Sequence, residues 1–143
     1  MNAKIIKTDA DLKKALDIRQ KVFVEEQNVP LADEFDEFDT LGESCQHILA
    51  HYNEQPVGTG RLRIVNGAGK LERICILKPY RQDGLGKIII NKLEEIAKAK
   101  GISQVKLHGQ THAEEFYKKL NYQTASDEFT EDGIPHILMT KTF

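Results

Sequence analysis

The residues best suited to chemistry in this chain form a short loop after an apolar run. The run Ile74–Leu77 meets Pro79, and Arg81–Lys87 then reads R-x-x-G-x-G-K ahead of an amphipathic segment. This order places backbone N–H groups that lack internal partners at the positive end of a predicted helix, where phosphates bind well. Glycine also lets a backbone approach its ligand closely. The loop therefore predicts a site for a phosphate-bearing ligand, with added positive charge from Arg81 and Lys87.

Two common phosphate-binding patterns are excluded. The Walker pattern G-x-x-x-x-G-K-[ST] is absent from the chain. The dinucleotide pattern G-x-G-x-x-G fails at this loop, because Ile89 stands at its third glycine. It fails again at Gly58–Gly60, where Arg63 takes that position.

Composition predicts one soluble domain that spans residues 1–143. Hydrophobic residues make up 40% and charged residues 29%, and the net charge of −2 argues against nucleic-acid binding. No apolar run reaches the length of a membrane helix, and the first residues do not resemble a secretory signal. Cys45 lies far from Cys75 in the sequence, so we expect two reduced thiols in a cytoplasmic protein.

Hydrophobic periodicity predicts a mixed α/β sheet with helices on both faces. The first helix is expected to begin at a cap formed by Asp9 or Asp11. An acid-rich loop or short helix is expected over 28–42, and Gly101 is expected to end the long helix. The expected strands are 4–8, 46–52, 57–65, 70–77, 105–108 and 136–142, and the expected helices are 9–27, 84–100 and 113–120.

A second motif joins the loop. Phe116–Tyr122 reads F-Y-x-x-L-N-Y, which resembles the F-Y-x-x-L-G-[FY] motif of the GNAT N-acetyltransferases. The glycine loop resembles their acetyl-CoA loop, and the order of elements is similar over nearly the whole chain. Asn121 replaces the usual glycine, and asparagine tolerates the left-handed conformation needed there. The chain is identified by these motifs as a member of that superfamily.

Further segments resemble smaller groups of the superfamily. Arg19, Val22–Gln27 and Gly133–Met139 are similar to a small bacterial subfamily of the YjcF and ElaA kind. Leu71–Ile74 is similar to the glucosamine-phosphate acetyltransferases. Asp83 departs from the pattern by placing a carboxylate beside the expected diphosphate, which favours weaker binding rather than none.

The resemblance implies acetyl-CoA as the co-substrate. It implies a sheet whose fourth and fifth strands splay apart, with a backbone N–H near Ile76 donating to the thioester oxygen. It also assigns the proton donor for the leaving thiolate to Tyr117, whose alternative role is core packing. The residues it assigns to coenzyme binding are Ile74, Ile76, Arg81, Gln82, Asp83, Gly84, Leu85, Gly86 and Lys87.

Glu72 is the candidate general base. Strand alternation predicts that it shares one face with Ile74 and Ile76. The alternatives are a carboxylate in solvent or paired with Lys70, and a water chain in place of any dedicated base.

The acceptor site is predicted from the first helix and the last strand. Arg19 lies on the helix's apolar stripe, so it needs a partner. That partner is either an anionic group of the acceptor or the carboxylates of 33–39. The resemblance places this helix, and with it Glu25, beside the acceptor. His136, at the start of the last strand, is a further candidate contact, and its alternative is a hydrogen-bonded structural histidine. No pattern of histidines or acids in the chain fits a zinc or calcium site, so no metal is expected.

These observations predict an acetyl-CoA-dependent N-acetyltransferase. Its acceptor is a primary amine of a small molecule, with an amino-sugar phosphate such as glucosamine 6-phosphate as one candidate. The alternatives are a CoA-binding sensor without turnover and a protein N-acetylase. No nucleic-acid or membrane partner is expected, and a homodimer is left open.

Overall fold

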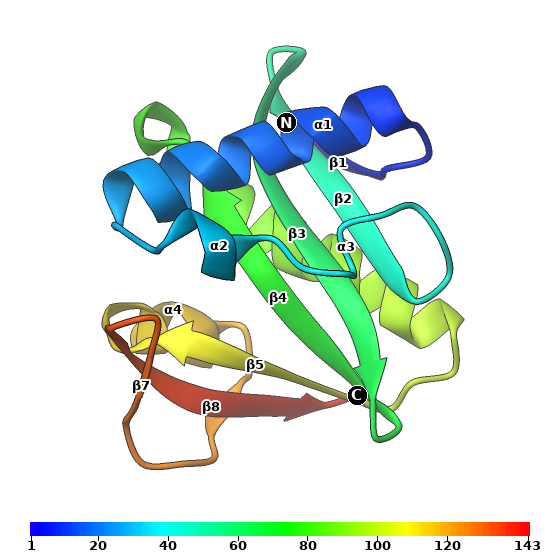
Figure 1. The fold of residues 1–143 in the computed structure, drawn as a ribbon. Helices are drawn as coiled ribbons and strands as arrows, with labels where there is room; N and C mark the ends of the chain where they lie inside the picture. Colours follow the sequence, from blue (N-terminus) through cyan, green and yellow to red (C-terminus); the bar gives the residue numbers. More distant parts are fainter.

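The computed structural model describes residues 1–143 and forms a mixed sheet with helices on both faces (Figure 1). The strands run in the order β1-β2-β3-β4-β5-β8-β6, and β7 pairs with β8 off this path. Every pairing is antiparallel except that of β4 with β5. The strands are β1 (Asn2–Ile5), β2 (Cys45–Tyr52), β3 (Gln55–Val65), β4 (Ala68–Ile76), β5 (Gln104–Gln110), β6 (Gln123–Thr124), β7 (Phe129–Glu131) and β8 (Ile134–Thr142).

The helices lie in two layers, with α1 and α2 on one face and α3 and α4 on the other (Figure 1). Helix α1 continues directly into the π-helical segment η1, and short 3₁₀ turns precede α3 and α4. The bounds are α1 (Asp9–Arg19), η1 (Gln20–Glu26), α2 (Leu31–Glu34), η2 (Lys78–Tyr80), α3 (Leu85–Ala99), η3 (Thr111–Ala113) and α4 (Glu114–Lys119). The predicted α/β fold is confirmed, and none of the helices has both the length and the apolar character that a membrane span requires.

The start of α1 differs from the prediction. Thr8, not Asp9 or Asp11, is the N-cap, and its hydroxyl accepts a hydrogen bond from the Asp11 amide at 3.2 Å. The Asp11 carboxylate instead pairs with Lys4 at 3.1 Å. The first strand also ends at Ile5 rather than Thr8, because its pairing with β2 ends there.

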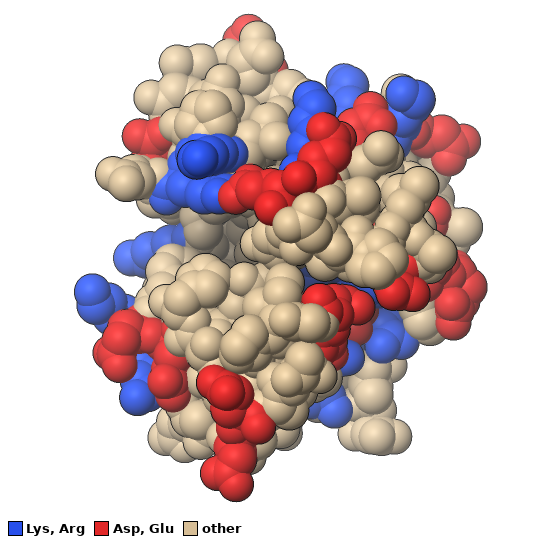
Figure 2. Space-filling model, turned by 60° about the vertical axis from the view of Figure 1, so that its left-hand side comes forward, with Lys and Arg blue, Asp and Glu red and all other residues tan.

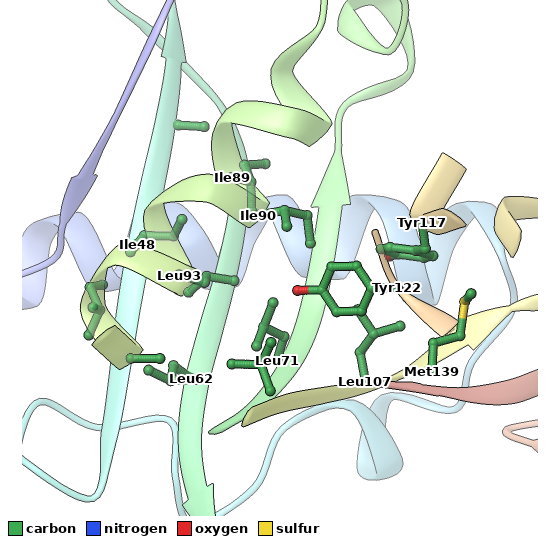
Figure 3. Close-up of a cluster of buried hydrophobic side chains, with 14 of the residues drawn as sticks. Ile48, Leu62, Leu71, Ile89, Ile90, Leu93, Leu107, Tyr117, Tyr122 and Met139 are labelled. Carbon is green, nitrogen blue, oxygen red and sulfur yellow. The ribbon is translucent and has the colours of Figure 1, made fainter. Parts of the chain in front are cut away.

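Two hydrophobic clusters hold the layers to the sheet. On one side, Ile89, Ile90 and Leu93 of α3 are fully buried against the strands (Figure 3). The other side has a smaller cluster in which Leu12 and Ile18 of α1 pack with strand residues. Complete burial of one such side chain contributes about 1.5–3 kcal/mol to stability. The two clusters therefore fix the helices that flank the site.

The edge strands β6 and β7 were not predicted. They contain two and three residues and are too short to show alternation. A turn at Asp132 and Gly133, with φ values of 52° and 75°, joins β7 to β8. Two left-handed residues are typical of a tight hairpin, and Asp-Gly is one of its preferred pairs.

Candidate active site

The cleft begins where two parallel strands separate. Gly69–Leu71 of β4 pair with Val105–Leu107 of β5. Both strands continue further, but their later residues do not pair with each other. Beyond this point the strands diverge (Figure 1). A cavity of about 380 Å³ lies in the opening and is lined by both strands and by α4. From outside it is a groove with charged side chains of both signs along its rims (Figure 2).

The glycine loop forms one end of this cavity. Gly84 has a φ of 84°, and a Cβ there would meet no atom within 4 Å, so the backbone is open to a ligand. No side chain caps α3 at this residue. The first amides of α3 are therefore free to bind an anion. Gly86 is required for another reason, since its Cβ would lie 2.9 Å from the Phe116 ring.

The other loop residues contribute differently. Gln82, Asp83 and Lys87 are exposed, whereas the side chain of Leu85 is fully buried in the core. Leu85 therefore offers a ligand only its backbone.

Arg81 joins three segments around the cleft. Its two terminal nitrogens donate to the two carboxylate oxygens of Glu26, each at 2.6 Å. Its Nε donates to the carbonyl oxygen of Ile76 at 2.9 Å. The hydrogen bond from Arg81 lowers the pKa of the Glu26 carboxyl. Arg81 thus holds the end of β4 against the end of η1.

A β-bulge changes the predicted face of Glu72. Arg73 has a φ of 56°, and the register between β3 and β4 shifts at this point. The extra residue reverses the alternation that follows it. Ile74 and Ile76 consequently pack on the α3 side, while Glu72 points to the opposite face. The predicted common face of these three residues is wrong.

The surroundings of Glu72 are strongly cationic. Arg63 donates to it at 2.8 Å, Arg61 at 3.1 Å, and Lys70 lies at 3.0 Å. Burial by itself would raise the pKa of Glu72, but these cations outweigh it and lower the pKa to about 2. A carboxylate held in this state does not take a proton from an amine. The alternative pairing with Lys70 is observed.

The amide of Ile76 faces the opening. The next residue, Leu77, donates its N–H to Val57 of β3 at 2.8 Å. Successive N–H groups of a strand point to opposite edges, so the Ile76 N–H points away from β3. The Ile76 N–H therefore points toward the gap between β4 and β5.

Tyr117 lies at the cavity wall on the α4 side, next to Tyr122 and Leu107 (Figure 3). Its hydroxyl makes no hydrogen bond within the protein. Because every buried side-chain nitrogen and oxygen of the chain has a partner, this hydroxyl is not buried, and it opens on the cavity that Tyr117 lines. Burial raises its pKa to about 12, and the phenol therefore keeps its proton at neutral pH. Its ring meets the Phe116 and Tyr122 rings edge to face.

Of the three predicted acceptor residues, only His136 lines the cavity. Glu25 is exposed on η1. Arg19 is 1% exposed, donates from Nε to Glu34 at 2.9 Å, and also pairs with Asp39. Of the two partners predicted for Arg19, the structure therefore shows the carboxylates of 33–39.

The cavity also contains residues that sequence reasoning did not assign. His108 of β5 and Glu131 of β7 meet there, with His108 Nδ1 2.9 Å from a Glu131 oxygen. The sequence signal that could have found Glu131 is the Asp132–Gly133 dipeptide, which predicts a hairpin before the last strand.

Known proteins are similar to this chain over nearly its whole length. The model of the family described as acetyltransferase (GNAT) domain matches residues 12–143. The chain is 67% identical to the uncharacterized protein YyaT of Bacillus subtilis, over 99% of this chain and 95% of that protein. It is 47% identical to the uncharacterized N-acetyltransferase YjcF of the same organism, over 99% of each chain.

Solved structures give a consistent result. Escherichia coli ElaA superposes with a TM-score of 0.86 at 26% identity, over 99% of each chain. The PaiA N-acetyltransferase of Thermoplasma acidophilum, solved in complex with coenzyme A, has a TM-score of 0.74 at 18% identity, over 100% of each chain. At this identity the second likeness shows the fold alone.

Proposed function

The chain belongs to the GNAT family of N-acetyltransferases, and on this premise we propose that it transfers the acetyl group of acetyl-CoA to a primary amine of a small molecule. One observation carries the proposal. A single cavity contains the gap between β4 and β5, the open glycine at the start of α3 and the unbonded hydroxyl of Tyr117.

The residues present fit acetyl-CoA. The open backbone at Gly84 and the free amides that follow it suit a diphosphate. The unpaired edges of β4 and β5 offer N–H and C=O groups to an amide-bearing arm, in the way that a sheet edge accepts a further strand. Arg81 supports this surface by holding the Ile76 carbonyl.

Two groups of the protein serve the acyl transfer. The Ile76 N–H donates to the oxygen that gains negative charge as the amine attacks. The Tyr117 hydroxyl supplies the proton that the departing thiolate needs. Acetyl-CoA, when bound, supplies the activated acyl group.

Charge at the cavity favours a cationic acceptor. Its lining includes Glu131 and Asp132, and Asp132 forms no ion pair. The three cations of the lining are all paired: Lys70 with Glu72, Arg73 with Glu34 and Arg81 with Glu26. A phosphate would find no free cation there. We therefore place a polyamine or an aminosugar without phosphate ahead of the amino-sugar phosphate, which is supported only by the resemblance of Leu71–Ile74.

An acceptor screen tests the proposal. Purified protein is mixed with acetyl-CoA and with spermidine, kanamycin or glucosamine 6-phosphate, and release of the CoA thiol is followed. Thiol release is expected with spermidine or kanamycin and little with glucosamine 6-phosphate. Failure to release thiol with all three would contradict the proposal, and a preference for glucosamine 6-phosphate would restore the phosphate acceptor.

A binding measurement tests the coenzyme site separately. Gly84→Val places a branched side chain at a left-handed residue, which costs about 1–2 kcal/mol of strain and closes the phosphate approach. Calorimetry is expected to show weaker acetyl-CoA binding by about tenfold or more, with native circular dichroism. Unchanged affinity would show that the loop is only a turn.

A further inference from the structure

Two histidines share one carboxylate at the wall of the cavity. His108 Nδ1 lies 2.9 Å from Oε1 of Glu131, and His136 Nε2 lies 3.7 Å from Oε2 of the same residue. The Phe129 ring meets the His108 ring edge to face at 5.1 Å and stacks on His136 at 6.1 Å. The hairpin of β7 and β8 thus fixes both imidazole rings.

Only one of the two histidines has a free ring nitrogen. His136 Nδ1 lies 2.7 Å from the Ile134 carbonyl, and its Nε2 faces Glu131, so neither nitrogen is open. When His108 donates Nδ1–H to Glu131, its Nε2 carries a lone pair. Nε2 has no partner in the protein, and no side-chain nitrogen or oxygen without a partner is buried. The Nε2 atom of His108 is therefore accessible at the cavity wall.

His108 and Tyr117 lie on opposite faces of β5. Gln110, two residues after His108 and on the same face, donates to Gln27 at the end of η1 at 2.9 Å. This face therefore looks toward α1 and η1. Between them, Gly109 faces α4, where a Cβ would stand 3.1 Å from the Tyr117 ring. The imidazole of His108 and the phenol of Tyr117 thus lie on opposite sides of β5, and both line the same cavity.

We propose that His108, oriented by Glu131, is the general base that deprotonates the acceptor amine. This inference rests on the proposed function. Its chemical form is that of a histidine whose carboxylate partner selects the tautomer and stabilises the imidazolium. His108 takes the role of general base that the sequence predicted for Glu72, because the oxygens of Glu72 are paired with three cations.

The proton inventory balances. His108 Nε2 takes one proton from the acceptor ammonium and releases it to water. The freed lone pair forms the C–N bond to the acyl carbon while the C–S bond breaks. Tyr117 protonates the thiolate, and the second nitrogen proton returns through water to the Tyr117 oxygen. The sum is one amide, one thiol and one released proton.

The charged groups around His108 support this role. Glu131 contacts its ring directly, and His108 lowers the pKa of the Glu131 carboxyl, so the carboxylate stays ionised. Lys70 and His136 also act on Glu131. His112 lines the cavity as well, but it is bonded to the Gln110 amide oxygen at 2.8 Å and has no carboxylate to stabilise its imidazolium.

Kinetics at several pH values test the base. The probe is spermidine, with His108→Gln compared with His51→Gln, a change on β2 outside the cavity. At pH 7, His108→Gln is expected to lower kcat/KM by about 10²-fold or more. The deficit should shrink as the pH rises above the pKa of the amine, which then arrives deprotonated. A deficit that stays constant with pH, or no deficit at pH 7, would overturn the proposal.

A second readout needs no turnover. Long-range ¹H–¹⁵N NMR of the labelled protein is expected to show the Nδ1–H tautomer of His108 and its loss in Glu131→Gln. An Nε2–H tautomer would overturn the base alone and leave the acetyltransferase activity standing. A wild-type protein that acetylates none of the amines in the screen would overturn the proposed function and the base with it.

Discussion

The ring of Tyr117 packs directly on the backbone of Gly109. A Cβ at this glycine would stand 3.1 Å from Cε2 of the ring and 3.2 Å from its Cδ2 atom. These distances are too short for an ordinary contact, so the ring takes its place only because residue 109 has no side chain. The contact joins the strand that borders the cleft to the proposed proton donor.

Gly109→Ala should displace the Tyr117 ring by a few tenths of an ångström. We expect kcat to fall by about 3- to 10-fold with unchanged acetyl-CoA affinity, because the added Cβ meets the Tyr117 ring and Leu107 but not the glycine loop. The double variant with Tyr117→Phe should be no slower than Tyr117→Phe alone. Additive losses in kcat would show that Gly109 acts by another route.

Tyr117→Phe should lower kcat by about 10²-fold with little change in acetyl-CoA affinity. Because burial raises the pKa of Tyr117 to about 12, the wild-type phenol stays protonated as the pH rises through neutrality. Loss of the donor should therefore appear across the whole range from pH 6 to 9. Stopped-flow or steady-state thiol release measures it, and a kcat within about twofold of wild type would assign the tyrosine to core packing.

Arg19→Met should destabilise the fold without changing acceptor recognition. The change leaves Glu34 with only Arg73 and Asp39 with only Arg61 as a cationic partner, and removing one partner of a buried pair costs up to about 3–5 kcal/mol. Lys13→Met is the matched control, because its pair with Asp17 is exposed. Thermal melts should show a large loss only for Arg19→Met. A normal melt with a raised acceptor KM would return Arg19 to the acceptor site.

The buried ion pairs also predict acid sensitivity. Burial alone would raise the pKa values of Asp36 and Glu72, but their arginine partners outweigh it and lower both to about 2. The pKa values of these carboxyls in the unfolded chain are 3.8 and 4.5. Each ionised carboxylate stabilises the fold at pH values above its unfolded pKa, and this stability is lost as the pH falls toward 2. Burial raises the pKa of Glu34. Protonation of this carboxyl therefore favours the folded state as the pH falls, which partly offsets the loss of stability from Asp36 and Glu72.

Urea unfolding between pH 6 and pH 2 measures this effect. The wild-type free energy of unfolding should fall mainly below about pH 4.5. Glu72→Gln should be less stable at pH 6 and should lose less of its stability on acidification. An equal acid loss in both proteins would show that Glu72 does not contribute to it.

Much of the fold was predictable from the sequence. The 3.6-residue period of Leu85, Ile89 and Leu93 predicts one buried helical face, and all three are fully buried. The glycine loop and the Phe116–Tyr122 motif also identify the family, because both are local patterns. The capping residue of α1 and the strands β6 and β7 escaped prediction. The cap depends on which of several neighbouring side chains reaches a free helix amide, and strands of two or three residues form only through their pairing with β8.

The amino-acid sequence by itself determined the family, the glycine loop proposed to bind phosphate and the candidate donor Tyr117, because these depend on residues adjacent in the chain. Tertiary structure alone decided the role of Glu72 and the meeting of His108 with Glu131. One bulge residue, Arg73, reverses the face of everything beyond it, and alternation cannot detect an inserted residue. His108 meets Glu131 only because the hairpin of β7 and β8 folds back across the open end of β5. Contacts between residues so far apart in the chain follow from strand register, which no local pattern encodes.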